Sequence, residues 1–152
     1  LIETGVTDLD GQLLQVERHV RLTHRNQYVS DAAAAMTRIL YSLGEGLDLR
    51  KALECHAKPW ASTGQFDTWN HFPDRTVIGR HLTMACYLPE SFTASLYLCW
   101  KYADDFSAGI LANAHCGGDN CHRGAVVGAL LGAANSVSGK WTEGLTSVPP
   151  LI

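Results

Sequence analysis

The chain has 152 residues, 46% of them hydrophobic, and a formal net charge of −3 at pH 7. This length suits one domain with a moderate core. Lysine and arginine form no basic stripe, so we do not expect a dedicated nucleic-acid binder. The most apolar run, Gly124–Ala134, is far shorter than the roughly 20 residues that cross a bilayer, so we expect no membrane span.

Five cysteines are spread along the chain in an odd number. A chain of this length does not need disulfides for stability, so the pattern favours a reducing compartment, and we expect a cytoplasmic protein. The sequence starts at Leu1 without an initiator methionine. We therefore expect residues 1–152 to be either a single domain or the C-terminal fragment of one that is incomplete at its N-terminus.

The first third of the chain shows helical periodicity after a loop over residues 1–11. Apolar residues at helix-like spacing predict a short helix over Gln12–Leu22, with Asp8 or Asp10 available to cap it, and a longer one over Gln27–Leu43. The glycines that follow, Gly44 and Gly46, are typical of helix ends. Asp48 is a good cap for a further helix that reaches Ala57.

The middle of the chain is less regular. Prolines and a glycine are interspersed with aromatic residues over Lys58–Arg75, which predicts an ordered loop. The next segment, Thr76–Leu88, is expected to be either helical or extended, because its apolar residues fit a helix only moderately. A new helix is expected to start at Pro89-Glu90-Ser91.

Asp104 or Asp105 is expected to begin another helix, which runs up to a glycine pair. Residues 136–152 are rich in Ser, Gly, Thr and Pro and predict a C-terminal surface coil. No segment shows the alternation of a β-strand. We therefore predict an all-α helical bundle.

One stretch, Ala114–Asn135, combines polar residues with a small-residue helix. Gly124, Gly128 and Gly132 recur every four residues and so lie on one helical face. Each interior glycine costs about 1 kcal/mol of helix stability relative to alanine, which is tolerable where the face packs closely on another backbone. We therefore expect this helix to be central in the fold.

The turn before this helix is the first site candidate. Gly117, Gly118, Asp119 and Asn120 precede the helix, so their backbone N–H groups and the positive end of the helix dipole would suit an anion such as phosphate. Asp119 would instead favour a cation or a substrate hydroxyl. The alternative is that Asp119 or Asn120 only caps the helix.

The same region contains soft metal ligands and a possible nucleophile. His115, Cys116, Cys121 and His122 lie within eight residues, but this spacing is not that of a common zinc site, so we do not expect zinc. Cys121, beside Arg123 at a helix start, would be reactive if its thiol pKa were lowered. A buried and inert Cys121 is the interpretation we favour.

Two other features leave alternatives open. His24 follows the first helix and would hydrogen-bond either a ligand phosphate or a neighbouring carbonyl group. The aromatic residues between Trp60 and Phe72 would either stack on an adenine or pack on one another within the loop.

Several of these segments together resemble the C-terminal part of the ADP-ribosylglycohydrolases. They are Pro89-Glu90-Ser91-Phe92, then Asp104-Asp105-Phe106, then the run from Ala112 through Gly117-Gly118-Asp119, and the Gly124–Ala133 helix. Thr23-His24 followed by an alanine-rich helix that ends at Gly44 and Gly46 is also similar. The likeness extends over about residues 23–136, and its most specific part is the last third.

The resemblance implies an all-α fold. It also implies an enzyme that removes ADP-ribose from protein side chains or cleaves related conjugates, usually with two magnesium ions. The family's metal motif is Gly-Gly-Asp-Thr-Asp-Thr, and here Gly117, Gly118 and Asp119 match its start. Asp119 would then bind a remaining metal ion or the ribose hydroxyls, and His24 would contact the diphosphate. The substrate-binding residues predicted in this way are His24, Gly117, Gly118 and Asp119.

The chain departs from that motif at two positions. Cys121 occupies the place of the second aspartate and His122 that of the final threonine, and neither Asp8 and Asp10 nor Asp104 and Asp105 match the family's N-terminal acidic motif. Mg²⁺ requires oxygen ligands, so we expect weakened or absent magnesium sites.

The resemblance and these departures support competing functions. The first is a hydrolase of the bond between ADP-ribose and a protein side chain, which acts on ADP-ribose conjugates or ADP-ribosylated protein. The second is a protein that binds ADP-ribose without turnover. The third is a structural protein on the same scaffold, as in the lens crystallins of the family.

Overall fold

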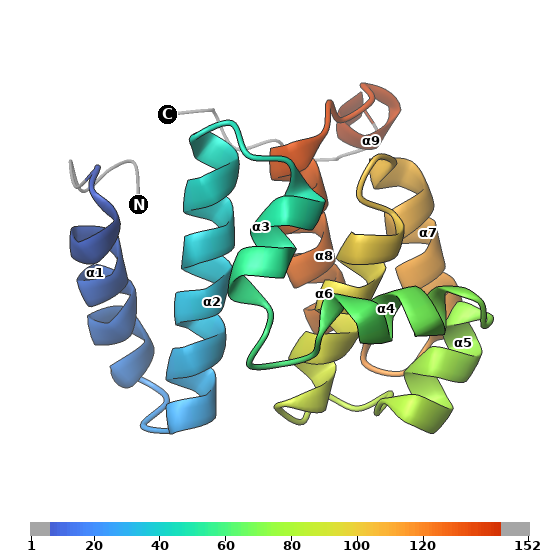
Figure 1. Ribbon diagram of the computed structural model, residues 1–152, viewed down its shortest axis with the longest axis horizontal. Helices are drawn as coiled ribbons and strands as arrows, with labels where there is room; N and C mark the ends of the chain where they lie inside the picture. Colours follow the sequence, from blue (N-terminus) through green and yellow to red (C-terminus); the bar gives the residue numbers. More distant parts are fainter. Residues whose placement is uncertain (1–6, 144–152) are drawn as a thin grey trace.

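A computed structural model describes residues 7–143, which fold into helices around one hydrophobic core (Figure 1). The helices, in chain order, are α1 (Leu9–Arg21), α2 (Gln27–Gly44), α3 (Leu49–His56), α4 (Thr63–Asn70), α5 (Asp74–Thr76), the irregular turn η2 (Val77–His81), α6 (Glu90–Lys101), α7 (Phe106–Cys116), α8 (Asn120–Ala134) and α9 (Lys140–Glu143). No strand forms among these residues, which confirms the all-α prediction.

Side-chain caps start the helices of the first third. The first helix, α1, begins at Leu9 and not at the predicted Gln12, so residues 9–11 are helical where a loop was expected, because Asp8 already caps the first turn. Oδ1 of Asp8 accepts a hydrogen bond from the backbone N–H of Gly11 at 2.8 Å, and Oδ1 of Asp48 accepts one from Lys51 at 3.0 Å. Each bond satisfies a donor that the first turn of a helix leaves unpaired. The cap predicted at Asp48 is therefore confirmed, and of the two candidates for α1 it is Asp8, not Asp10, that caps the helix. The helix α1 packs against α2 at one edge of the bundle (Figure 1).

The centre of the bundle is formed by α6 and α8. Every residue from Phe92 to Trp100 in α6 is buried, so this helix is enclosed on all sides. The helix α8 packs against α2, α6 and α7, which confirms the central place predicted for it. Its glycine face is turned to α7, where a Cβ at Gly128 would lie 3.6 Å from Ile110.

The prediction of a loop over Lys58–Arg75 is wrong, because α4 and α5 lie within it. Ser62 caps α4 through a 3.2 Å hydrogen bond from Gln65, and Phe66 and Trp69, three residues apart, are both buried. An apolar pair at that spacing can be presented by a helix of only two turns. The prolines and the glycine nearby hide such a short helical pattern in the sequence. Their burial supports the interpretation that these aromatic residues pack within the protein.

The end of the described chain differs in part from the expected coil. Residues 140–143 form the short helix α9, and the indole of Trp141 donates a 2.8 Å hydrogen bond to Oγ of Ser107 on α7. That anchor orders a segment whose composition favours a loop. The rest of the predicted coil, residues 144–152, lies outside the described residues. Across residues 7–143, no helix combines the length and apolar character that a bilayer span needs.

Candidate functional site

The turn between α7 and α8 is held by its two glycines and by a neighbouring loop. Gly117 and Gly118 have φ of +69° and +66°, a region that other residues rarely adopt. A Cβ on Gly118 would lie 2.7 Å from Cβ of Met84, so the turn is pressed against that segment. The N–H of Asp119 also donates to the carbonyl oxygen of Met84 at 2.8 Å. The glycines thus fix where Asp119 emerges.

These contacts occupy backbone N–H groups of the turn that were predicted to bind an anion. The N–H of Gly117 donates to Ala114 at 3.2 Å, and that of Asp119 is bound to Met84. Neither donor is available to a phosphate. The backbone N–H of Gly117 is therefore engaged within the protein, and the observed role of the two glycines is to shape the turn. Their predicted contact with a substrate stays a prediction.

Asp119 pairs with His122 one turn further along α8. Oδ1 of Asp119 and Nδ1 of His122 are 2.6 Å apart, while Asp119 makes no side-chain cap to the helix. The hydrogen bond from His122 is the main reason that the pKa of Asp119 lies below its ordinary value, with a smaller contribution from Cys86. The interpretation of Asp119 as a simple cap is wrong, because its carboxylate bonds to a side chain.

Arg123 joins the turn to α7 through hydrogen bonds of its guanidinium group. It is 4% exposed, and its Nε donates to Oδ1 of Asn113 at 2.7 Å while its Nη2 donates to the carbonyl oxygens of Gly117 and Asn113 at 2.7 and 3.2 Å. Burial lowers the pKa of Arg123. This structural role of Arg123 has no local signal in the sequence, where the residue stands out only as a neighbour of Cys121.

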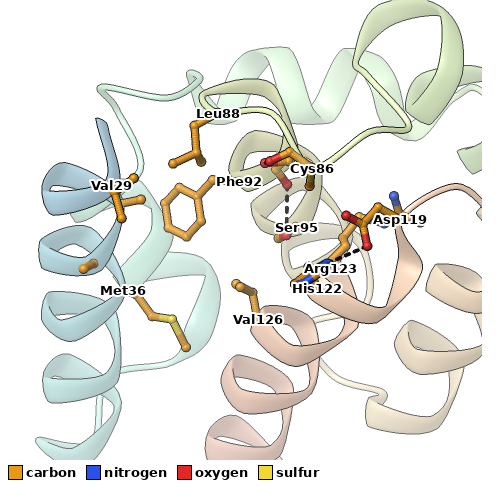
Figure 2. Close-up of a pocket in the computed structure, with 13 residues that line it drawn as sticks. Val29, Met36, Cys86, Leu88, Phe92, Ser95, Asp119, His122, Arg123 and Val126 are labelled. Carbon is orange, nitrogen blue, oxygen red and sulfur yellow. Dashed lines mark hydrogen bonds and ion pairs between the residues drawn. The ribbon is translucent and has the colours of Figure 1, made fainter. Parts of the chain in front are cut away.

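Asp119 and His122 lie at the edge of a pocket of about 240 Å³ between α2, α6 and α8 (Figure 2). Most of its wall is apolar, and the polar groups gather where α8 begins. The lining residues are Val29, Ala32, Ala33 and Met36 of α2, Ser91, Phe92 and Ser95 of α6, Asp119, His122, Arg123 and Val126 of α8, and Cys86 and Leu88 of the loop before α6. An apolar wall with a few polar groups at one side is typical of a small-molecule site.

The other predicted residues lie apart from this pocket. His24 is exposed in the loop between α1 and α2, where its Nδ1 is 2.9 Å from Oγ1 of Thr23, and it does not line the pocket. Cys121 is exposed, so the preferred interpretation of a buried thiol is wrong there; it holds for Cys116 instead. Cys121 is exposed because it faces away from the helices that α8 packs against.

The donor set at Asp119 does not fit a pair of magnesium ions. The pocket lining has one carboxylate, one imidazole and one thiol, and the hydroxyls of Ser91 and Ser95 donate hydrogen bonds to backbone carbonyl oxygens. Mg²⁺ prefers several oxygen ligands in octahedral geometry. Among residues 7–143, no three His, Cys, Asp or Glu side chains converge as metal ligands would. The Cys and His residues between His115 and His122 also do not form such a group.

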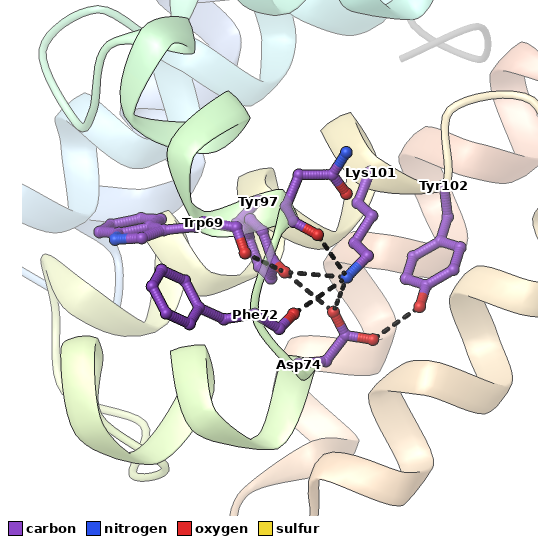
Figure 3. A network of polar contacts seen from close by, with 7 residues as sticks. Trp69, Phe72, Asp74, Tyr97, Lys101 and Tyr102 are labelled. Carbon is purple, nitrogen blue, oxygen red and sulfur yellow. Dashed lines mark hydrogen bonds and ion pairs between the residues drawn. The ribbon is translucent and has the colours of Figure 1, made fainter.

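A second polar cluster lies between α5 and the end of α6 (Figure 3). Asp74 accepts hydrogen bonds from Tyr97 at 2.9 Å and Tyr102 at 2.6 Å, and it forms a 2.8 Å ion pair with Lys101. Lys101 also donates to the carbonyl oxygens of Asn70 and Phe72. Because both carboxylate oxygens accept bonds from other elements, this cluster ties α5 to the end of α6.

Comparison with known proteins gives one positive result. The family model described as ADP-ribosylglycohydrolase matches residues 7–150. No curated protein and no solved structure matches the chain significantly.

Proposed function

The chain belongs to the ADP-ribosylglycohydrolase family, and from this we propose that it hydrolyses the N- or O-glycosidic bond between ADP-ribose and a protein side chain or a related conjugate. The observation that carries this proposal is the position of Asp119. The acid of the Gly-Gly-Asp motif lies on the polar edge of the α2–α6–α8 pocket and is held there by the docked turn.

The two sides of the pocket suit different parts of such a substrate. Phe92 and Val126 on the apolar wall offer a surface for the flat face of a base or a ribose ring. The carboxylate of Asp119 can accept a hydrogen bond from a ribose hydroxyl. Gly117 and Gly118 would then act indirectly, by fixing Asp119.

No step of this proposal passes through magnesium, because the donors around Asp119 do not fit it. A second candidate function follows from the same observation: binding of ADP-ribose without turnover. Cys121 and His122 stand where the resembling motif has two oxygen ligands, and that change favours a site that keeps the pocket while losing metal chemistry.

Calorimetry and a release assay separate these functions. The purified protein is titrated with ADP-ribose and incubated with arginine- and serine-linked ADP-ribosyl peptides, with and without Mg²⁺. Heat together with released ADP-ribose supports the hydrolase, heat without release supports the binding protein, and the absence of both removes the two functions.

Neighbouring residues on α2 provide a matched test of the pocket. Ala33→Phe places a ring in the pocket, whereas Ala34→Phe places the same ring on the side of α2 toward α1 and Tyr28. We expect A33F to lose binding and A34F to retain it, with circular dichroism reporting that both fold. Equal binding by the two variants would move the site away from this pocket.

A further inference from the structure

We infer that His122 is the acid–base residue of this site and that Asp119 is its positioning residue. This inference rests on the proposed hydrolysis and deepens it, since it assigns the proton transfer to a side-chain pair of this chain.

The contact between the two side chains fixes where the proton of the imidazole lies. A carboxylate only accepts hydrogen bonds, so at 2.6 Å the Nδ1 of His122 must carry the proton that Oδ1 of Asp119 receives. In the neutral ring, Nε2 then holds a lone pair. Among residues 7–143, Nε2 has no hydrogen-bond partner. The ring is therefore held with its basic nitrogen available.

The Asp119–His122 pair lies at the rim of the pocket, on the side where α8 begins. Both residues line the pocket, and their side chains are 24% exposed for Asp119 and 82% exposed for His122. Figure 2 shows the pair at the α8 side of the pocket, across from Val29 and Phe92. Asp119 is the better fixed of the two, because its backbone N–H is bonded to Met84.

The same pair explains the departure from the resembling motif. A threonine at position 122 would offer an oxygen ligand, whereas a histidine three residues after Asp119 reaches back along the helix to its carboxylate. Cys121 is not an alternative base. It does not line the pocket, and its Sγ lies 3.7 Å from Oδ1 of Asn120. His122 thus provides an acid–base group at a position where the family motif has an oxygen ligand for a metal ion.

The step that follows is a hydrolysis in which all atoms are accounted for. A water oxygen bonds to the anomeric carbon of ADP-ribose as the bond from that carbon to the side-chain nitrogen or oxygen breaks with its electron pair. Nε2 of His122 takes a proton from the water and then gives that proton to the leaving nitrogen or oxygen, so the imidazole returns to its neutral form. One water is consumed, and ADP-ribose and the free side chain are released.

Turnover by wild type and variants tests the assignment, with an ADP-ribosyl peptide as substrate and EDTA present. We expect His122→Ala to lower kcat roughly 10²-fold or more while KM stays close to that of wild type, and added imidazole to restore part of the rate. Asp119→Asn should lower kcat as well, and Cys121→Ala, the adjacent exposed position, should not.

A spectroscopic readout tests the pairing separately from activity. Long-range ¹⁵N–¹H spectra should show His122 protonated at Nδ1 in wild type and lose that preference in D119N. Turnover of H122A at the wild-type rate, or a wild-type rate abolished by EDTA, would overturn the assignment of His122 alone. A folded wild type that releases no ADP-ribose with or without Mg²⁺ would overturn the proposed hydrolysis itself, and this inference with it.

Discussion

Asn113 of α7 and Arg123 of α8 are joined side chain to side chain, with Nε of Arg123 donating to Oδ1 of Asn113 at 2.7 Å. The amide of Asn113 also donates from Nδ2 to the carbonyl oxygen of Asn120 at 2.9 Å. The side chain of the buried Asn113 therefore binds both the backbone of the first turn of α8 and the buried guanidinium of Arg123. These two hydrogen bonds fix the position of α8, and with it Asp119, along α7.

Loss of the guanidinium should destabilise the fold. Arg123→Met leaves Oδ1 of Asn113 and the carbonyl oxygen of Gly117 without their donor. The carbonyl oxygen of Asn113 loses its bond from Arg123 as well. Acceptors left unpaired in this largely buried place predict a loss of about 2–4 kcal/mol in the free energy of unfolding, measured by urea denaturation. Arg123→Lys keeps the charge but not the fork of donors, and should recover only part of the loss. A fully stable R123M would contradict this role.

The glycine stripe of α8 offers a matched pair of substitutions. A Cβ at Gly124 would lie 2.8 Å from Nδ2 of Asn113, which its own hydrogen bonds hold in place, whereas at Gly128 the nearest atom, of Ile110, is 3.6 Å away. We expect Gly124→Ala to destabilise the protein by about 1–2 kcal/mol, because overpacking exceeds the gain in helix propensity. Gly128→Ala should be neutral or stabilising by up to about 1 kcal/mol. Thermal melts of both variants check this, and the reverse order would contradict it.

Local signals in the sequence were enough for much of the fold. Asp48 was predicted as a cap, and Asp8 as one of two candidates with Asp10, because a cap needs only the residue itself and the next three positions. The packing of the Gly124 face was also predictable, since the spacing of small residues shows on one helix. The helix α4 was missed because its apolar pair, Phe66 and Trp69, is too short a pattern to outweigh nearby breakers.

One residue of the candidate site, Asp119, could be predicted from the sequence, but the pocket beside it could not. Asp119 was named from its motif, and the i,i+3 spacing to His122 was a signal that the two side chains could meet. The apolar wall could not be found in this way, because Val29, Phe92 and Val126 come from three helices whose packing no local pattern specifies. The burial of Arg123 likewise depends on α7.

The turn before α8 should resist substitution at both glycines, but unequally. Gly117 and Gly118 share a positive φ that strains any other residue, and at Gly118 an added Cβ also collides with the backbone of Met84. The nearest atom at Gly117 is 3.8 Å away. We expect Gly117→Ala to cost about 1–3 kcal/mol in unfolding free energy and Gly118→Ala clearly more. Urea denaturation measures both, and equal losses would show that the Met84 contact yields easily.

The Asp74 cluster should make stability depend on pH in the acid range. Burial alone would raise the pKa of Asp74, but hydrogen bonds from Lys101, Tyr102 and Tyr97 outweigh it and hold the pKa below its ordinary value. The folded protein therefore binds fewer protons at Asp74 than the unfolded chain does. The stability contributed by this carboxylate is complete above the unfolded-state pKa, about 4, and is lost as the pH falls through the lower folded-state value.

Asp74→Asn tests this directly, because it removes the charge and keeps the shape. The variant should lose about 3 kcal/mol of unfolding free energy at pH 7, since the largely buried ammonium of Lys101 keeps its charge but loses its only carboxylate partner among residues 7–143. Its stability should then fall less than that of wild type between pH 4 and pH 2. Asp104→Asn is the control: that carboxylate also pairs with a cation, Arg50 at 2.6 Å, but is 81% exposed, so the change should be under about 1 kcal/mol. Parallel pH profiles of D74N and wild type would show that the acid sensitivity arises from other carboxylates.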